Sequence, residues 1–186
     1  MPPLDRNNMS TALASVGPAK VPGLPIHTIA VLVRNQPGVL VRVSLVFARR
    51  GYNIESLVVS ADVTNGEFSR MTITCRGDRG TLEQIIKQLT KLIDVVHALD
   101  HTGAAVIETE IALCKLECAV NQRTEILQVA AQFGAKIVDS GATSMVVRIY
   151  GTSDKLDACL SLLTHYRIVE LVRSGKILMT RGLETT

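Results

Sequence analysis

The chain has 186 residues, of which 47% are hydrophobic and 20% are charged. This length suits one large domain or two small ones, and the composition excludes a wholly disordered chain. The 20 basic and 17 acidic residues leave a formal net charge of +3. Such a weak excess does not indicate a nucleic-acid partner, which would select a concentrated basic patch. No apolar run approaches the ~18 residues that span a bilayer, so we expect no membrane segment.

The first 26 residues differ in composition from the rest of the chain. They hold five of the six prolines, and no proline follows Pro37. They lack the apolar block of about 7 or more residues that a secretory signal requires. We therefore interpret residues 1–26 as a flexible tail. We expect a cytoplasmic location of the bacterial type, with the stroma of an organelle as the alternative.

The four cysteines of the chain are expected to be reduced thiols, because the sequence shows no export signal. Cys114 and Cys118 lie in a strand-like stretch, on the same face as Leu116 and Val120. Free cysteine is commonly buried, so this pattern predicts core cysteines. A zinc site would need tighter Cys/His spacing, and we predict no bound metal.

Hydrophobic periodicity predicts six elements in the first half of the chain. Apolar residues alternate along the strands and recur every three or four positions along the helices. Gly51 is expected to end the first helix, and Asn65-Gly66 to form a hairpin turn. Glu83 and Lys87 add an i,i+4 pair on the second helix. The expected strands are 27–34, 54–61, 68–75 and 95–99, and the expected helices are 39–47 and 82–93.

The same order of elements recurs in the second half. Thr152 and Ser153 can cap the second helix there. Two βαββαβ units predict an α+β fold with two ferredoxin-like domains, each with its helices on one face of an antiparallel sheet. We place these domains at 27–102 and 103–186. The expected strands are 111–120, 135–139, 144–150, 168–172 and 177–179, and the expected helices are 124–133 and one carrying 156–163.

The sequence shows no catalytic constellation. The four histidines are scattered, and the chain has no Walker-type phosphate loop and no G-x-G-x-x-G motif. We therefore predict no catalytic residues. The same fold serves RNA-binding domains, which stack bases on aromatic side chains of the two central strands. Strand 27–34 has no Phe, Tyr or Trp, and strand 68–75 has only Phe68, so we predict no RNA binding.

The segment Asn35-Gln36-Pro37-Gly38-Val39-Leu40 joins the first predicted strand to the first predicted helix. The first turn of a helix carries unpaired N–H groups and partial positive charge, so it suits an anion such as a carboxylate. Gly38 lets a ligand approach the backbone, and the amide of Asn35 can donate or accept a hydrogen bond. The alternative is an ordinary strand–helix turn in which Asn35 caps the helix.

Two segments carry a resemblance to a known family: this turn at 35–40, and the very specific run Arg-Arg-Gly-Tyr-Asn-Ile-Glu-Ser-Leu at 49–57. They resemble the signature of the small, or regulatory, subunit family of acetolactate synthase (acetohydroxyacid synthase). The resemblance extends over residues 27–183, whereas a generic ligand-binding ACT domain would share only the Pro-Gly-Val-Leu turn. Supporting segments lie at 69–73, 82–89, 91–95, 151–158 and 173–175.

The resemblance implies an N-terminal ACT domain at 27–102 and a C-terminal ferredoxin-like domain of this family at 103–186. It implies a non-catalytic subunit in branched-chain amino acid biosynthesis. Such a subunit activates a separate catalytic large subunit and confers feedback inhibition by valine or another branched-chain amino acid. Thiamine diphosphate, Mg²⁺ and FAD would belong to that catalytic partner, with no cofactor on this chain.

The resemblance also implies where the effector binds. ACT domains of the family pair side by side in a homodimer, with the effector at their interface. The carboxylate of the amino acid would meet the N–H groups around Gly38. The implied effector-binding residues are Asn35, Pro37, Gly38, Val39 and Leu40 of one chain, with Asn53 and Ile54 supplied by its neighbour.

Two other functions stay open at this point. A stand-alone ACT-type amino-acid sensor would share the turn at Gly38 but would act without an enzyme partner. A reactive cysteine of low pKa would be the best sign of an unrelated small enzyme on a ferredoxin-like fold. The core setting predicted for Cys114 and Cys118 argues against that enzyme.

Overall fold

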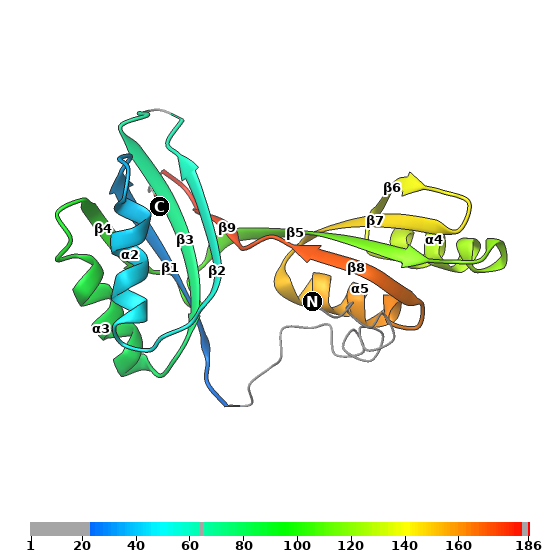
Figure 1. The fold of residues 1–186 in the computed structure, drawn as a ribbon, viewed down its shortest axis with the longest axis horizontal. Coiled ribbons are helices and arrows are strands. Elements are labelled where there is room, and N and C mark those ends of the chain that lie inside the picture. The colour runs from blue at the N-terminus through cyan, green and yellow to red at the C-terminus, as the bar shows by residue number, and fades with distance from the viewer. Residues whose placement is uncertain (1–22, 64, 184–185) are drawn as a thin grey trace, which may run out of the picture. The chain divides into compact units, whose positions relative to one another are not determined.

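The computed structural model describes residues 23–63, 65–183 and 186, so most of the tail predicted at 1–26 lies outside the described residues. The described chain forms two compact units. The first unit comprises residues 23–109 and 174–186, and the second comprises residues 110–173. Each unit contains an antiparallel sheet with two helices packed on it (Figure 1).

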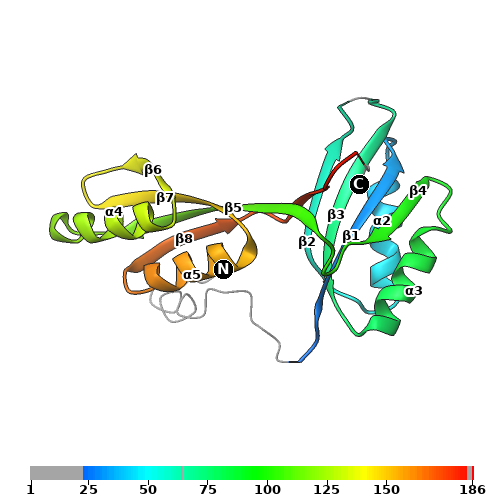
Figure 2. The same ribbon diagram turned by 180° about the vertical axis from the view of Figure 1, so that it is seen from behind.

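The first unit has the βαββαβ order predicted for it. Its elements are β1 (Ile26–Arg34), α2 (Val39–Ala48), β2 (Ile54–Ala61), β3 (Phe68–Arg76), α3 (Arg79–Leu89) and β4 (Val95–Asp100). The sheet order is β2-β3-β1-β4, so the two strands predicted to be central do lie in the middle. Both helices lie on the same face of this sheet, as the two opposite views show (Figures 1 and 2).

The core of the first unit lies between its sheet and its helices. Alternation along β1 directs Ile29, Val31 and Val33 toward the helices, where all three are buried. Val43 and Phe47 meet them from α2, one turn apart on the same side of the helix. This packing holds α2 against β1 and thereby sets the course of the turn that joins them.

Helix α3 ends earlier than its apolar spacing predicted. It closes at Leu89, and the hydroxyl of the next residue, Thr90, donates a hydrogen bond to the carbonyl of Ile86 at 3.1 Å. Leu92 packs against the core from the following turn, whereas Ile93 is 91% exposed. The prediction that the helix reaches residue 93 was wrong, because a turn can return a side chain to the core without continuing the helix.

The charges on α3 also differ from the prediction. Glu83 forms its ion pair with Arg79, across 3.8 Å, and not with Lys87. The helix starts at Arg79 because the carboxylate of Asp78 accepts a hydrogen bond from the amide of Thr81 at 2.7 Å. An aspartate at this position satisfies one of the unpaired first-turn amides, and it sets the start of the helix before its first apolar position.

The second unit repeats the architecture of the first. Its elements are β5 (Val106–Glu117), the short 3-10 helix η2 (Val120–Gln122), α4 (Arg123–Gln132), β6 (Lys136–Ser140), β7 (Ser144–Gly151), α5 (Ser153–Leu163) and β8 (Arg167–Arg173). The sheet order is β6-β7-β5-β8. Leu116, Val147 and Ile149 are buried under α4 and α5. The prediction of two ferredoxin-like domains is therefore confirmed.

The predicted core cysteines Cys114 and Cys118 are buried, with exposed fractions of 0% and 2%. Burial raises the pKa of the Cys114 thiol to about 12 and that of Cys75 to about 11. A thiolate is therefore disfavoured at both sites. The alternation predicted that Val120 shares their face, and this prediction was wrong. Val120 is 77% exposed, because β5 ends before it and η2 begins there.

The cap predicted for α5 takes a different form. Thr152 occupies the position before the helix, but its side chain makes no capping hydrogen bond. The hydroxyl of Ser153 donates instead to the carboxylate of Glu110, which is 5% exposed. Arg173 pairs with the same carboxylate at 2.5 Å. A buried carboxylate needs such partners, so these bonds tie α5 to β5 and β8.

The last strand, β9 (Ile177–Thr180), belongs to the first unit. It pairs with residues 106–109 at the start of β5. The sequence prediction placed the domain boundary after residue 102, whereas the structure groups 103–109 and 174–186 with the first unit. The difference arises because β5 is one continuous strand that contributes its two ends to different units.

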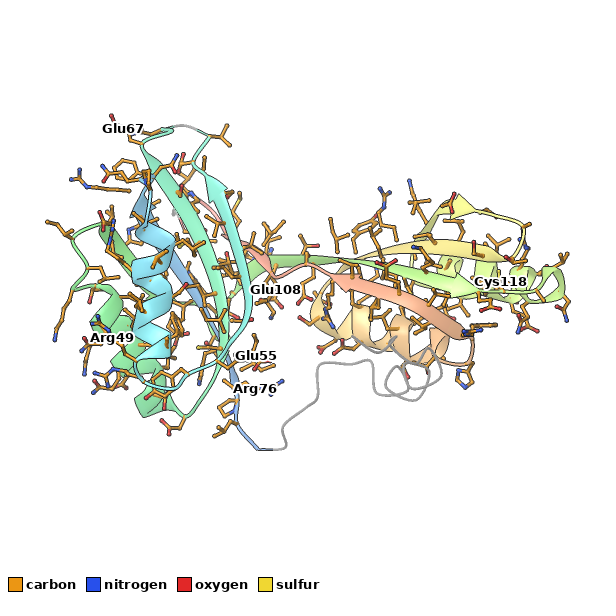
Figure 3. The ribbon with its side chains drawn as sticks, in the orientation of Figure 1. Arg49, Glu55, Glu67, Arg76, Glu108 and Cys118 are labelled. Atoms are coloured by element: carbon orange, nitrogen blue, oxygen red, sulfur yellow. The ribbon has the colours of Figure 1, made fainter. Side chains whose placement is uncertain are left out.

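The segment before β9 lies against β2, on the face of the first sheet opposite the helices. A Cβ built on Gly175 would lie 2.8 Å from Cγ2 of Val58 and 3.0 Å from Oγ of Ser56. Next to it, Lys176 pairs with Glu108 at 3.0 Å, and Glu108 is labelled in Figure 3. Only a residue without a side chain allows this close approach to β2.

Candidate effector site

The turn between β1 and α2 is tied down by backbone and amide hydrogen bonds. The amide N–H of Asn35 donates to the carbonyl of Glu67 at 2.7 Å, and its side-chain Nδ2 donates to the carbonyl of Gly66 at 3.0 Å. Glu67, labelled in Figure 3, marks the hairpin between β2 and β3. Asn35 therefore anchors the turn to this hairpin. The alternative in which Asn35 caps the helix is wrong.

Gly38 occupies the N-cap position of α2 without any side-chain cap. Its φ is +82°, in the left-handed region that glycine adopts without steric cost. A Cβ at this position would lie 3.2 Å from Nη1 of Arg42. The backbone at the start of α2 is therefore not covered by a capping side chain, and it lies beside the guanidinium group of Arg42.

The first turn of α2 keeps hydrogen-bond donors free for a ligand. The amide of Val39 reaches the carbonyl of Gln36 at 3.3 Å. The amides of Gly38, Leu40 and Val41 have no acceptor within the part of the chain that the structure describes. No acidic side chain stands in this turn. The helix dipole adds partial positive charge there, so the turn suits a carboxylate.

Arg42 adds a guanidinium group, paired with Asp94, that the sequence did not predict for the site. Its Nε donates to Oδ2 of Asp94 at 2.7 Å, and the Asp94 carbonyl accepts from the amide of Arg34 at 2.8 Å. Asp94 is 7% exposed, so it is a fixed support for the arginine. The spacing of Gly38 and Arg42, one helical turn apart, could have signalled this neighbour.

The side chains of the turn divide into core and surface. Val39 is buried, so only its backbone can serve the site. Leu40 and Val41 are exposed beside the free amides, and Pro37 is exposed before them. An apolar surface next to the partial positive charge of the helix N-terminus suits a ligand that carries a carboxylate and an aliphatic group.

Asn53 and Ile54 do not meet this turn within one chain. They follow the far end of α2, whose ten residues rise about 15 Å along the axis. Figure 1 shows the start of β2 at the end of the helix opposite to the Gly38 turn. Asn53 Nδ2 contacts Oε1 of Glu55 at 3.2 Å, and Ile54 is half-buried. Their supply by a neighbouring chain stays a prediction.

The described residues offer no sign of a metal centre. No cluster of three or more His, Cys, Asp or Glu side chains is found within them. His27 is buried, and its Nε2 lies 2.9 Å from the carbonyl of Gly77, where it serves the fold. In the same part of the chain, every helix is too short or too polar to cross a membrane.

Fold and site together define a class of protein: two ferredoxin-like domains, of which the first presents an ACT-type helix N-terminus open to an anion. Comparisons with known proteins narrow this class. Residues 29–97 match the acetohydroxyacid synthase (AHAS) small subunit-like ACT domain, and residues 109–182 match the family described as the small subunit of acetolactate synthase.

Individual relatives agree with these matches. The chain is 44% identical over 156 residues to a probable acetolactate synthase small subunit of Archaeoglobus fulgidus, covering 84% of this chain and 97% of that one. It is 41% identical over 160 residues to the acetolactate synthase small subunit of Mycolicibacterium smegmatis, covering 86% and 94%. The crystal structure of the Thermotoga maritima small subunit superposes with a TM-score of 0.76 at 34% identity, covering 85% and 98%. The chain belongs to the family of acetolactate synthase small subunits.

Proposed function

We propose that this chain is a regulatory subunit that activates a catalytic large subunit and makes it sensitive to valine or a related branched-chain amino acid. Membership in the small-subunit family implies a regulatory role and a catalytic partner. The observation that supports the effector site is the bare N-terminus of α2 at Gly38, with Arg42 beside it.

The proposed binding mode uses each part of the amino acid. Its carboxylate accepts hydrogen bonds from the free amides of Gly38 and Leu40, and the guanidinium group of Arg42 offers further N–H donors beside them. Its ammonium group donates to Oδ1 of Asn35, whose Nδ2 is already engaged with the hairpin. Its branched side chain lies on the exposed apolar surface of Leu40 and Val41.

The proposed site is completed in a homodimer formed through the ACT domains. Within the described chain β2 is an edge strand, paired only with β3, and Asn53 and Ile54 stand at its start. An open edge strand favours pairing with a second chain. An effector bound between two chains stabilises one arrangement of the pair over others, and this preference can be transmitted to the partner.

We assign thiamine diphosphate, Mg²⁺ and FAD to the catalytic partner, in keeping with the regulatory role. Burial raises the pKa of Cys75 to about 11 and that of Cys114 to about 12, so a thiolate nucleophile is disfavoured at either residue, which supports this assignment.

Reconstitution tests this proposal. The purified chain alone is expected to form no acetolactate, to raise the rate of the purified catalytic subunit, and to make that rate fall with added valine. Turnover by the chain alone would contradict a regulatory role. Valine binding without any effect on the catalytic subunit would favour a stand-alone sensor instead.

A further inference from the structure

A hollow lies on the helical side of the first unit and shares Arg42 with the Gly38 turn. It is an open groove of about 630 Å³ between α2 and the C-terminal end of α3. Four of its lining side chains are cationic, namely Arg42, Arg49, Arg50 and Lys91, and none of the described lining residues is acidic. Arg49 is labelled in Figure 3, on the helical layer of the unit.

Most of this charge is uncompensated. Arg42 is neutralised by its ion pair with Asp94. Arg49, Arg50 and Lys91 are exposed, and none of them takes part in an ion pair within the described chain. Lone basic residues at a helix C-terminus are ordinary, since they complement the dipole. Three of them around one groove produce a local positive field that attracts an acidic partner.

The arrangement of the cations favours an elongated partner over a compact anion. Arg42 in α2 and Arg49 at its C-cap stand seven positions apart, about 10 Å at the rise of a helix. The groove is flanked by the C-terminal ends of both helices, which close at Ala48 and Leu89. Such ends present carbonyl groups, whereas a bound phosphate prefers the N–H groups of a helix N-terminus. Separate cations suit carboxylates spaced along a protein segment.

The floor of the groove is apolar. Leu45 is 41% exposed, and Val46 and Leu92 are half-buried beside it. An apolar floor with a charged rim is the pattern that binds one face of an amphipathic helix. Charges at the rim mainly speed association and select the partner, whereas apolar anchors on the floor slow its release.

We propose that this groove docks an acidic, amphipathic surface segment of the catalytic subunit. The inference rests on the proposed regulatory function and adds the surface by which the two subunits meet. The groove and the effector turn lie on the same helix, α2, and share Arg42.

The test compares matched charge reversals. The groove variant is Arg49→Glu with Arg50→Glu, and Arg42 is left intact because it also serves the effector turn. The control is Lys87→Glu with Lys136→Glu, which changes the net charge equally at exposed lysines outside the groove. Both full-length variants are titrated into the purified catalytic subunit at low and at physiological salt, with enzyme activation as the readout.

We expect the groove variant to raise the concentration for half-maximal activation by about tenfold at low salt, and to flatten its salt dependence. The control should behave as wild type. Calorimetry of the isolated groove variant should show unchanged valine binding, which verifies its fold. Half-maximal activation at the wild-type concentration would overturn the docking proposal. If the wild-type chain itself does not activate the catalytic subunit, the proposed regulatory function is wrong, and the docking proposal that rests on it is wrong as well.

A second arm separates a protein segment from a small polyanion. Inorganic triphosphate is titrated calorimetrically into the isolated wild-type chain and into the groove variant. We expect the wild-type chain and the groove variant to give the same result with triphosphate. Tight triphosphate binding that depends on Arg49 and Arg50, together with unchanged activation by the variant, would assign the groove to a phosphorylated small molecule and overturn the proposal.

Discussion

A single residue position, Gly38, controls both the shape and the charge of the candidate effector site. Its positive φ begins α2 without a side-chain cap, so the first-turn amides face outward. Asn35 shows the complementary role, because its amide bonds hold the turn to the β2–β3 hairpin and leave Oδ1 free to accept. Asn35 thus anchors the turn, and Gly38, three positions later, leaves the first-turn amides exposed.

Gly38→Asp is expected to abolish most feedback inhibition and to leave activation intact. The new carboxylate would lie beside Arg42, occupy the place of the effector carboxylate and repel it. Loss of a coupling of about 1–3 kcal/mol is enough for this effect. The strained backbone should cost about 1–3 kcal/mol of folding stability. The measurement is an activity curve against valine for the reconstituted complex.

Gly103→Asp is the matched control for this change. Gly103 also has a positive φ, of +71°, but a Cβ there would meet nothing within 4 Å. The Gly103→Asp variant should have the same backbone strain and should keep the wild-type sensitivity to valine. If the Gly38 variant folds and stays as sensitive as its control, the carboxylate does not bind at this turn.

Single polar groups determine where individual helices begin. The start of α3 depends on Asp78, whose carboxylate accepts from the amide of Thr81. The hydrogen bond from the backbone amide of Thr81 is the main reason why the pKa of Asp78 lies below its usual value, and the amide of Gly80 lowers it further. A carboxyl group whose pKa is lowered by folding stabilises the native state above its unfolded pKa, and this contribution is lost as the pH falls through the folded value.

Asp78→Ala is therefore expected to lower the melting temperature at neutral pH, because an alanine cannot cap the helix. The difference from wild type should shrink as the pH drops through the acidic range in which Asp78 takes up a proton. Asp78→Asn serves as the control, since asparagine caps a helix about as well without charge. Thermal unfolding of all three proteins across pH measures this. A difference from wild type that does not vary with pH would contradict the assigned role of the carboxylate.

The segment leading into β9 depends on an equally local feature, the missing side chain of Gly175. Gly175→Ala should destabilise the protein by about 1–3 kcal/mol, the usual cost of overpacking. The added methyl group would press on Val58 and Ser56 of β2. Gly66→Ala, where a Cβ would meet nothing within 4 Å, is the control. Equal stability of the two variants in denaturant titrations would show that the segment does not rest on β2.

At the scale of the whole molecule, the proposed effector site needs two chains. The turn at Gly38 and the pair Asn53 and Ile54 stand at opposite ends of α2, so one chain cannot close the site. A dimer would place the start of β2 from one chain near the turn of the other. Light scattering in the presence of valine should accordingly show at least a dimer, and a monomer at micromolar concentration would contradict the interface site.

Mixing two valine-insensitive variants gives the sharpest test of this arrangement. Gly38→Asp and Asn53→Ala should each abolish valine sensitivity as homodimers. A dimer with one chain of each kind has one site with both changes and one site with neither. Co-refolded mixtures should therefore regain part of the valine inhibition. If they stay insensitive, both residues act within the same chain or Asn53 does not contact the effector.

Much of the fold followed from local patterns in the sequence. Alternation along 27–34 and 68–75, and helical spacing along 39–47, depend on the period of each element alone, so both βαββαβ orders and the buried Cys114 could be predicted. The Pro-Gly turn was equally readable, because an N-terminal helix turn exposes its amides wherever it occurs.

Only the tertiary structure decided which distant groups meet. The pairing of Arg42 with Asp94 and of Asn35 with Gly66 joins residues far apart in sequence. The placement of β9 beside the start of β5 likewise changed the domain boundary. A repeating apolar pattern specifies which face of an element is buried, but it does not identify the chain segment that covers that face. Contacts between polar groups require directions and distances, and these are set only when the sheets have assembled.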